Sequence, residues 1–286
     1  MRAGFVGLGA MGMPMARNLH RASLLSVVWN RTSEKAQTLA AELGCRVAPS
    51  LASLAAEVDV VVLCVAADAD VLEVVGALAP ALKAGSLVLD CSTVSAQTEG
   101  RAAEVLRGSD FLDCPVSGGV EGARAGTLVI MVGGDAQAFE RARPVLTALG
   151  KTITYFGPTG SGQAAKATNQ IMCAGIIEAV AEAMAFAHAQ GLPLTQLVDT
   201  LGKGAGSSWY FVHRAPNMIR GSYPPGFKVR LHAKDLRICH DMAARFGVAL
   251  PVVERVLDEY NELMARGYGD EDISATYRLK AELFGA

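Results

Sequence analysis

This sequence of 286 residues lacks an excess of charge of either sign. Its 26 lysines and arginines nearly balance its 28 aspartates and glutamates, so the formal net charge is only -2. Proteins that gather nucleic acid or anionic lipid usually carry a strong basic field. We therefore expect neither a nucleic acid nor a membrane as partner, and any bound anion must be held by a local site.

Long hydrophobic runs are also scarce. The apolar stretches look too short, and too often broken by charge, to provide the roughly 20 residues that cross a bilayer. A signal peptide is not predicted, because Gly7, Gly9 and Gly12 interrupt the apolar stretch after Arg2. We expect no membrane span and a cytoplasmic protein.

Paired cysteines and spaced histidines are missing. The six cysteines contain no C-x-x-C pair, and the five histidines form no set with metal-ligand spacing. The sequence therefore predicts no metal site, and it predicts buried thiols in a reducing compartment. The cysteines are Cys45, Cys64, Cys91, Cys114, Cys173 and Cys239.

The first half of the chain alternates short β-branched runs with amphipathic stretches, which is typical of β-α units around a parallel sheet. Residues Asp59 to Val65 (DVVVLCV) are almost wholly apolar, as expected for a strand covered by helices on both faces. The predicted strands are Ala3–Gly7, Leu25–Trp29, Val58–Val65, Leu87–Asp90, Phe111–Cys114, Thr127–Val132 and Ile153–Phe156.

The second half has helical periodicity throughout. Apolar residues recur at helical spacing from Gln163 to Gln190, until Gly191 and Pro193 end the pattern. Further helices are predicted at 194–201, 209–219, 228–246, 251–266 and 273–283. The predicted fold is α/β: a doubly wound sheet over residues 1–160, then an all-helical domain over residues 161–286 that begins with a long helix.

A glycine motif follows the first predicted strand and opens a helix. It reads Gly7-Leu8-Gly9-Ala10-Met11-Gly12, the G-x-G-x-x-G pattern. Gly7 permits a tight turn, Gly9 lets the backbone approach a pyrophosphate, and Gly12 lets the helix pack on the strand. The motif in this context predicts a Rossmann-type dinucleotide site.

The end of the second strand distinguishes between two nicotinamide cofactors. An acidic residue there would bind the ribose of NAD, but this chain has Asn30-Arg31-Thr32. These side chains can hold a 2′-phosphate, whereas a carboxylate would repel it. We therefore favour NADP, with NAD as the alternative. Arg31 can also be an ordinary exposed charge at a turn.

Four motifs in one order resemble the β-hydroxyacid dehydrogenase family, which includes 3-hydroxyisobutyrate dehydrogenase, and the resemblance covers nearly the whole chain. The motifs are Gly7 to Asn18, Asp113-Cys114-Pro115-Val116-Ser117-Gly118-Gly119 with Gly122 and Gly126 following, Gly160-x-Gly162-x-x-x-Lys166-x-x-Asn169, and Lys234-Asp235-Leu236. The resemblance implies hydride transfer between a nicotinamide cofactor and a small carboxylate.

Lys166 is the candidate proton donor. Hydride delivery to an aldehyde leaves negative charge on its oxygen, so a cation or proton donor must stand beside it. Lys166 follows a glycine-rich turn, and Asn169 and Gln170 share its helical face at i+3 and i+4. The resemblance implies that Lys166 is catalytic and that Asn169 contacts substrate. Without the motif, Lys166 would be taken for a solvent-exposed helix lysine.

Ser117-Gly118-Gly119 comes just after a strand, where ligands collect in open α/β sheets. Its backbone N–H groups and the Ser117 hydroxyl can form a nest for the substrate carboxylate, and the resemblance gives Ser117 the same role in the reaction. A plain turn is the alternative.

The resemblance also implies roles for residues with no local signal. Val65, Ala66 and Thr93 match positions that touch the cofactor, and Lys234 matches a lysine that reaches cofactor and substrate. Unaided, Lys234 and Asp235 look like an exposed pair on a helix.

Two features bear on specificity. Many relatives have a second asparagine where this chain has Gln170, so that contact is expected to shift. Trp209-Tyr210-Phe211 can lie at the mouth of the site, although an aromatic cluster at a helix start is more often core.

We expect an NADP(H)-dependent reductase of small semialdehydes or glyoxylate, or its reverse. The alternatives are an imine reductase and a non-catalytic NADP-binding module. The long apolar helix further predicts a homodimer or homotetramer.

Overall fold

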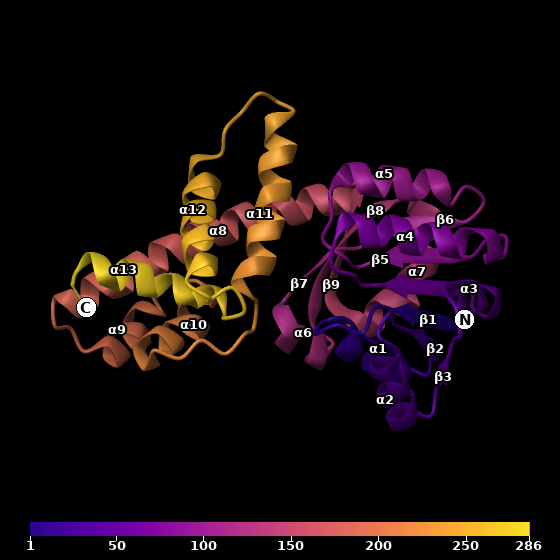
Figure 1. The fold of residues 1–286 in the computed structure, drawn as a ribbon, viewed down its shortest axis with the longest axis horizontal. Coiled ribbons are helices and arrows are strands. Elements are labelled where there is room, and N and C mark those ends of the chain that lie inside the picture. Colours follow the sequence, from indigo (N-terminus) through magenta and orange to yellow (C-terminus); the bar gives the residue numbers. More distant parts are fainter. Residues whose placement is uncertain (286) are drawn as a thin grey trace. The chain divides into compact units, whose positions relative to one another are not determined.

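The structure, a computed structural model, describes residues 1–285 (Figure 1). It divides into two compact units, one from Met1 to Lys166 and one from Ala167 onward. The division falls inside a helix, after Lys166, whereas the sequence places the boundary before that helix, at residue 160.

A mostly parallel sheet forms the centre of the first unit. Its order is β3-β2-β1-β4-β5-β6-β8-β7, with β9 paired to β8. The six neighbouring strands from β3 through β2, β1, β4 and β5 to β6 are parallel. Strand β8 is antiparallel to β6 and β7. The strands are β1 (Ala3–Val6), β2 (Leu25–Trp29), β3 (Arg46–Val47), β4 (Val60–Leu63), β5 (Leu87–Asp90), β6 (Asp110–Asp113), β7 (Val116–Ser117), β8 (Leu128–Gly134) and β9 (Gly150–Gly157).

Helices cover both faces of this sheet, as the apolar strands predict. Consecutive residues of a strand pack into different apolar clusters. Phe5 of β1 and Val62 of β4 belong to one cluster, whereas the next residues, Val6 and Leu63, belong to another. Both faces are therefore buried, which is the doubly wound arrangement. The helices are α1 (Gly12–Arg21), α2 (Ser33–Leu43), α3 (Leu51–Glu57), α4 (Asp68–Leu78), η1 (Ala79–Ala81), α5 (Ala96–Val105), α6 (Gly119–Ala125) and α7 (Ala136–Leu149).

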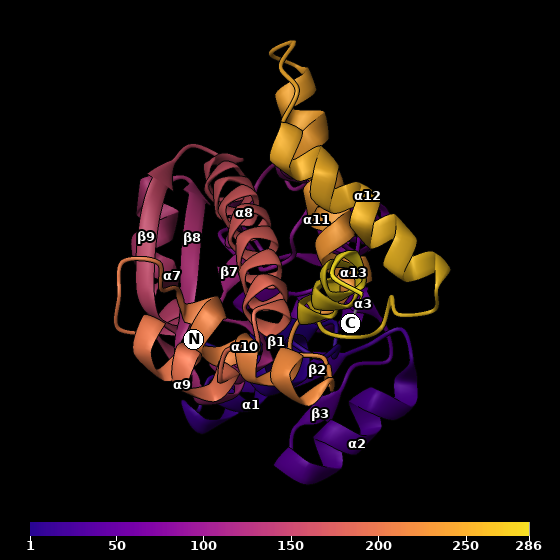
Figure 2. The ribbon, with the colours of Figure 1, turned by 90° about the vertical axis from the view of Figure 1, so that its left-hand side faces the viewer.

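The second unit is helical, as predicted. Figure 2 shows α11 and α12 side by side, and a single apolar cluster with Tyr260 fully buried forms its core. Its elements are α8 (Ser161–Ala189), which begins in the first unit, α9 (Leu194–Leu201), α10 (Trp209–Arg220), α11 (Val229–Ala244), α12 (Pro251–Ala265), η2 (Ile273–Thr276) and α13 (Tyr277–Leu283).

Helix α8 corrects one expectation. By length and composition it is apolar enough to cross a membrane, so the inference that every hydrophobic run is too short was wrong. The core helix of a soluble protein passes the same test. Here Ala174, Ile177 and Ala181 of α8 are buried in the core of the helical unit, so composition is weak evidence for a span.

Three local features differ from the predicted elements. The two-residue strands β3 and β7 were not predicted. The predicted helix 273–283 begins as the 3-10 turn η2, because Asp272 accepts hydrogen bonds from the backbone N–H and the hydroxyl of Ser274.

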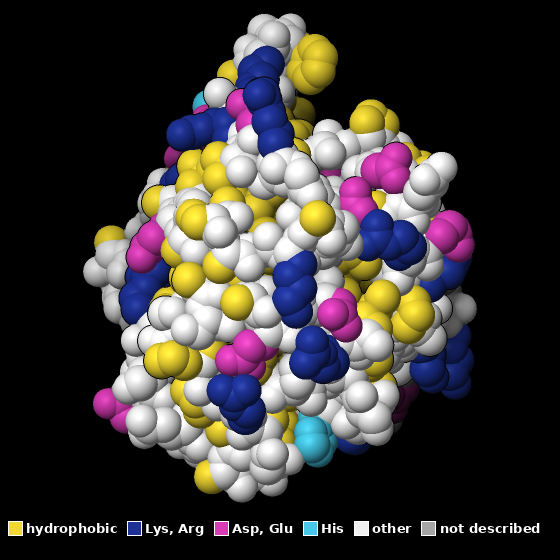
Figure 3. All heavy atoms as spheres, turned by 90° about the vertical axis from the view of Figure 1, so that its right-hand side faces the viewer, with side chains coloured by type: hydrophobic (Ala, Val, Ile, Leu, Met, Phe, Trp, Pro, Cys, Tyr) yellow, Lys and Arg dark blue, Asp and Glu magenta, His cyan; other side chains and the backbone are white. Residues whose placement is uncertain are grey.

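Basic and acidic side chains are interspersed on the face drawn in Figure 3. Two of the ion pairs of the first unit join Arg17 to Glu42 and Arg46 to Glu57, each at 2.7 Å. Both signs of charge are thus present on the face drawn in Figure 3, in keeping with the balanced composition.

Candidate functional site

The glycine motif connects β1 to α1. The strand order reverses beside it, between the neighbouring strands β1 and β4. A Cβ at Gly7 would stand 2.3 Å from the Cys64 carbonyl, and φ there is +92°. A Cβ at Gly12 would stand 1.9 Å from the Gly7 carbonyl, whereas one at Gly9 would meet nothing within 4 Å. Gly7 and Gly12 are thus required by the chain's own packing, while Gly9 faces open space.

The rest of the loop is held by Asn30, which follows β2. Its Oδ1 accepts the backbone N–H of Leu8 at 2.8 Å, and its Nδ2 donates to the Thr32 carbonyl at 2.9 Å. Leu8 is buried, Ala10 is exposed, and Met11 precedes α1 without a side-chain cap. In the first turn of α1 the Met13 N–H donates to the Gly9 carbonyl at 3.1 Å and Pro14 has no N–H, so this helix start offers a phosphate mainly the positive end of the helix dipole.

Arg31 lies beside carboxylates of α4. Its guanidinium donates to Asp70 and reaches Glu73 at 3.4 Å, and its side chain is 65% exposed. Asp70 and Glu73 therefore compete with any phosphate for this guanidinium.

The loops that follow β4 and β5 are tied together. The Ser92 hydroxyl accepts the backbone N–H of Val65 at 2.9 Å, while Ala66 is exposed and Thr93 half-buried. Because β4 and β5 are adjacent and parallel, these predicted cofactor residues share the carboxyl edge of the sheet.

The turn after Ser117, where the substrate nest is predicted, is built on two glycines. Ser117 ends β7, and Gly118 and Gly119 follow with φ of +127° and +63°. Helix α6 starts at Gly119, with Gly118 exposed. Both φ values favour glycine, which leaves the backbone of this turn without side chains that would keep a carboxylate away.

Lys166 is buried, with 7% of its surface exposed, in the second turn of α8. Lysine is rarely buried to this extent unless it has a partner. It is therefore not the solvent-exposed helix lysine that the alternative reading supposed.

Sequence reasoning gave no role to Asp113, Gln163 and Glu99, which are all buried. Burial raises the pKa of the Asp113 carboxyl, and backbone N–H groups partly offset this. Burial, then the charges of Asp90 and Asp113, raise the pKa of Glu99 well above its usual range. Of these three, only Asp113 had a signal in the sequence, because it is an acidic residue at the end of an apolar strand.

In the helical unit a chain of polar contacts joins the predicted residues. Asn169 Nδ2 donates to Gln170 Oε1 at 2.9 Å, Gln170 Nε2 donates to Asp235 Oδ2 at 2.7 Å, and Lys234 Nζ lies 3.0 Å from Asp235 Oδ1. Asp235 is buried, so Lys234 and Asp235 are not an exposed pair. The longer arm of Gln170 is used to reach Asp235.

The aromatic cluster is divided. Tyr210 and Phe211 belong to the core of the helical unit, whereas Trp209 is 56% exposed and stacks on His213. At most Trp209 is free to contact a ligand.

Metal-ligand geometry is absent from the described residues: no group of three or more His, Cys, Asp or Glu side chains converges in them. None of the six cysteines forms a disulfide bond, and three of them, Cys91, Cys114 and Cys239, are buried.

Two family profiles match the chain. That of the NAD binding domain of 6-phosphogluconate dehydrogenase matches residues 2–157. The profile described as NAD-binding of NADP-dependent 3-hydroxyisobutyrate dehydrogenase matches residues 160–280. Together they span both units.

Known proteins match over nearly their whole length. NAD-dependent L-serine dehydrogenase of Pseudomonas aeruginosa is 37% identical, with 96% of each chain covered. 2-Hydroxy-3-oxopropionate reductase of Escherichia coli is 37% identical, covering 96% of this chain and 95% of the relative. The structure of Mycobacterium tuberculosis 3-hydroxyisobutyrate dehydrogenase with L-serine is 33% identical with a TM-score of 0.88, covering 98% and 99%.

Proposed function

Because this chain belongs to the 3-hydroxyisobutyrate dehydrogenase family and is an NAD(P)-dependent β-hydroxyacid dehydrogenase acting on CH–OH groups, we propose that it transfers a hydride between NADP(H) and a small 3-hydroxy acid or its semialdehyde. Lys166 is the general acid and base of this reaction. The observation that carries the proposal is the burial of Lys166 in the glycine-rich start of α8.

Lys166 moves the proton. A bound nicotinamide would supply or accept the hydride at the substrate carbon that carries the oxygen. The Lys166 ammonium then donates a proton to the oxygen during reduction, and the neutral amine accepts it during oxidation.

The substrate carboxylate is held by the nest at Ser117, Gly118 and Gly119. The hydroxyl and consecutive N–H groups supply several donors for one anion. Asn169 supplies a further donor, and Lys234 a cation whose position Asp235 fixes at 3.0 Å.

NADP is the proposed cofactor. Residues of the glycine motif from Gly7 to Gly12 receive the pyrophosphate, Arg31 and Thr32 receive the 2′-phosphate, and Val65, Ala66 and Thr93 border the nicotinamide half. Asn30 acts indirectly, because its amide is used on Leu8 and Thr32. The NADP-dependent family description supports this choice, and the NAD-dependent serine dehydrogenase among the relatives supports the alternative.

The substrate class is tested by NADPH oxidation against glyoxylate and the semialdehydes of succinate, tartronate and methylmalonate, and by NADP reduction with L-serine and 3-hydroxyisobutyrate. We expect the highest kcat/KM with a three- or four-carbon acid that carries its oxygen on the β-carbon. Turnover of a cyclic imine in preference to all of these would favour an imine reductase. Binding of NADPH with no turnover of any would favour a non-catalytic module.

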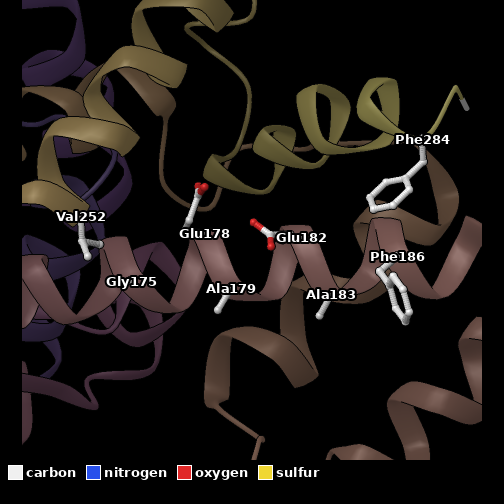
Figure 4. A pocket seen from close by; sticks show the side chains of 8 residues that line it. All are labelled: Gly175, Glu178, Ala179, Glu182, Ala183, Phe186, Val252 and Phe284. Atoms are coloured by element: carbon white, nitrogen blue, oxygen red, sulfur yellow. The ribbon is translucent and has the colours of Figure 1, made fainter.

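A homodimer or homotetramer is proposed from a groove in the helical unit. The groove, of about 570 Å³, runs along α8 with Val252 at one end and Phe186 and Phe284 at the other (Figure 4). Phe186 and Phe284 are 53% and 44% exposed. Small residues four apart, at Ala179 and Ala183, leave room for an apolar surface of a second copy.

A further inference from the structure

The carboxylate of Asp113 binds the start of the helix that carries Lys166. Its Oδ1 accepts the backbone N–H of Gly160 at 2.8 Å, and its Oδ2 accepts that of Gln163 at 2.9 Å. Asp113 is fully buried at the end of β6. A strand residue thus supplies the acceptors that the first turn of α8 requires, and the sheet holds the helix directly.

Two glycines make room for this contact. A Cβ at Gly162 would lie 2.7 Å from Asp113 Oδ2 and 2.6 Å from the Met131 carbonyl. A Cβ at Gly133, on the neighbouring strand β8, would lie 2.4 Å from Asp113 Oδ1. Any larger residue at either position would displace the carboxylate, so the packing here leaves Asp113 and α8 little freedom.

The side chain of Gln163 makes a second connection. Its Nε2 donates to the Ser92 carbonyl at 2.9 Å and to the Glu99 carboxyl, and its Oε1 accepts the backbone N–H of Val94 at 3.3 Å. Gln163 is 1% exposed. Because Ser92 and Val94 flank Thr93, this amide fixes the loop after β5 to the first turn of α8.

We propose that Asp113 and Gln163 are positioning residues that fix Lys166 relative to Thr93 and Ser117. Lys166 comes one helical turn after Gln163, so its backbone position follows from the two connections. Asp113 lies four residues before Ser117 in the chain, so one strand end sets both the substrate nest and the helix start. This inference rests on the proposed function, in which Lys166 meets the reacting oxygen.

The test is Gln163→Met, which keeps the side-chain length and removes its hydrogen bonds. A displacement of about 1 Å at a reacting group costs on the order of 100-fold in rate. We expect kcat to fall about 10- to 100-fold, with KM for the acid and Kd for NADPH within about twofold of the wild type. Asp135→Asn is the control, since Asp135 caps α7 of the same unit through the N–H groups of Gln137 and Ala138.

A double-mutant cycle separates positioning from general damage. If Gln163 acts through Lys166, Gln163→Met will not lower the residual rate of Lys166→Ala any further. An additional loss of tenfold or more in that background overturns the inference. So does an unchanged kcat in Gln163→Met while Lys166→Ala is inactive, and the proposed function then stands.

A second variant covers the case in which Gln163→Met does not fold. Asp113→Asn places an amide –NH2 opposite a backbone N–H, so the expected kcat loss is of the same size. Unchanged kcat in a folded Asp113→Asn protein overturns the inference. Full activity in Lys166→Ala would overturn both the proposed function and this inference. That result differs from those that overturn the inference alone.

Discussion

Arg31 is the side chain on which the cofactor preference depends. It lies between Asp70 and Glu73 but is largely exposed, so a 2′-phosphate can replace the carboxylates as its partner. A hydrogen bond to a charged group contributes about 1.5–3 kcal/mol, so Arg31→Ala should lower kcat/KM for NADPH by about 10-fold or more. The value for NADH should stay within about twofold.

The matched control for Arg31 is Arg46→Ala, because Arg46 is similarly exposed and pairs with Glu57 in the same unit. Steady-state kinetics with both cofactors gives the answer. An equal loss with NADPH and NADH would mean that Arg31 does not contact the 2′-phosphate.

Glu99 gives the first unit a pH-dependent stability. Burial raises its pKa well above the usual range, so the native state retains a proton that the unfolded chain releases near its ordinary pKa of about 4.3. The contribution of Glu99 to the free energy of unfolding is therefore fully present below that pH, and it is lost as the pH rises toward the pKa of the native state. Glu99→Gln has no proton to lose and keeps an acceptor for Gln163, so its Tm advantage over the wild type should grow between pH 4 and 8.

The exposed Glu104, on the same helix α5, provides the comparison through Glu104→Gln. Thermal unfolding followed at several pH values measures both variants. A Tm difference for Glu99→Gln that does not change with pH would show that Glu99 is ionised in the native state.

At the scale of elements, the glycine loop separates packing from ligand binding. Gly12→Ala places a Cβ 1.9 Å from the Gly7 carbonyl, so it should lower the free energy of unfolding by about 3 kcal/mol. Gly9→Ala meets nothing within 4 Å, so its Tm should match the wild type. A methyl group there would still obstruct the pyrophosphate, and we expect the Kd for NADPH to rise at least about tenfold.

Calorimetry for stability and fluorescence titration for NADPH distinguish the two glycine variants. Unchanged NADPH affinity in Gly9→Ala would place the cofactor away from this loop.

Elements with a strong period were predictable and short ones were not. The bounds of β2, β5 and α9 agree with the sequence pattern, because each is a continuous run of suitable residues. A two-residue strand such as β3 has no alternation to detect. The 3-10 turn η2 depends on a cap by Asp272 that periodicity does not reveal.

The site could be predicted only in part, for a physical reason. The glycine motif and the lysine helix have local patterns, since a turn or a helix start imposes them on neighbouring residues. The contacts of Asp113 with Gly160 and Gln163 join residues 47 and 50 positions apart. Nothing in the local sequence marks such partners, nor the reach of Gln170 to Asp235.

At the scale of the whole molecule, the groove on α8 predicts self-association. Ala183→Arg fills the groove beside Ala179 and Phe186 with a long charged side chain and should shift the protein toward monomer, measured by size-exclusion chromatography with light scattering. Val105→Arg, at an exposed position on α5, is the control and should leave the mass unchanged. A wild-type protein that is monomeric at micromolar concentration would contradict the proposed oligomer.

The most direct test of the account is the rate of hydride transfer in Lys166→Ala, measured in a single turnover with bound NADPH and the best semialdehyde. Loss of a general acid typically costs about 100- to 10,000-fold, and we predict a loss in that range with the Kd for NADPH unchanged. Transfer at close to the wild-type rate would contradict the central claim that the Lys166 nitrogen supplies the proton.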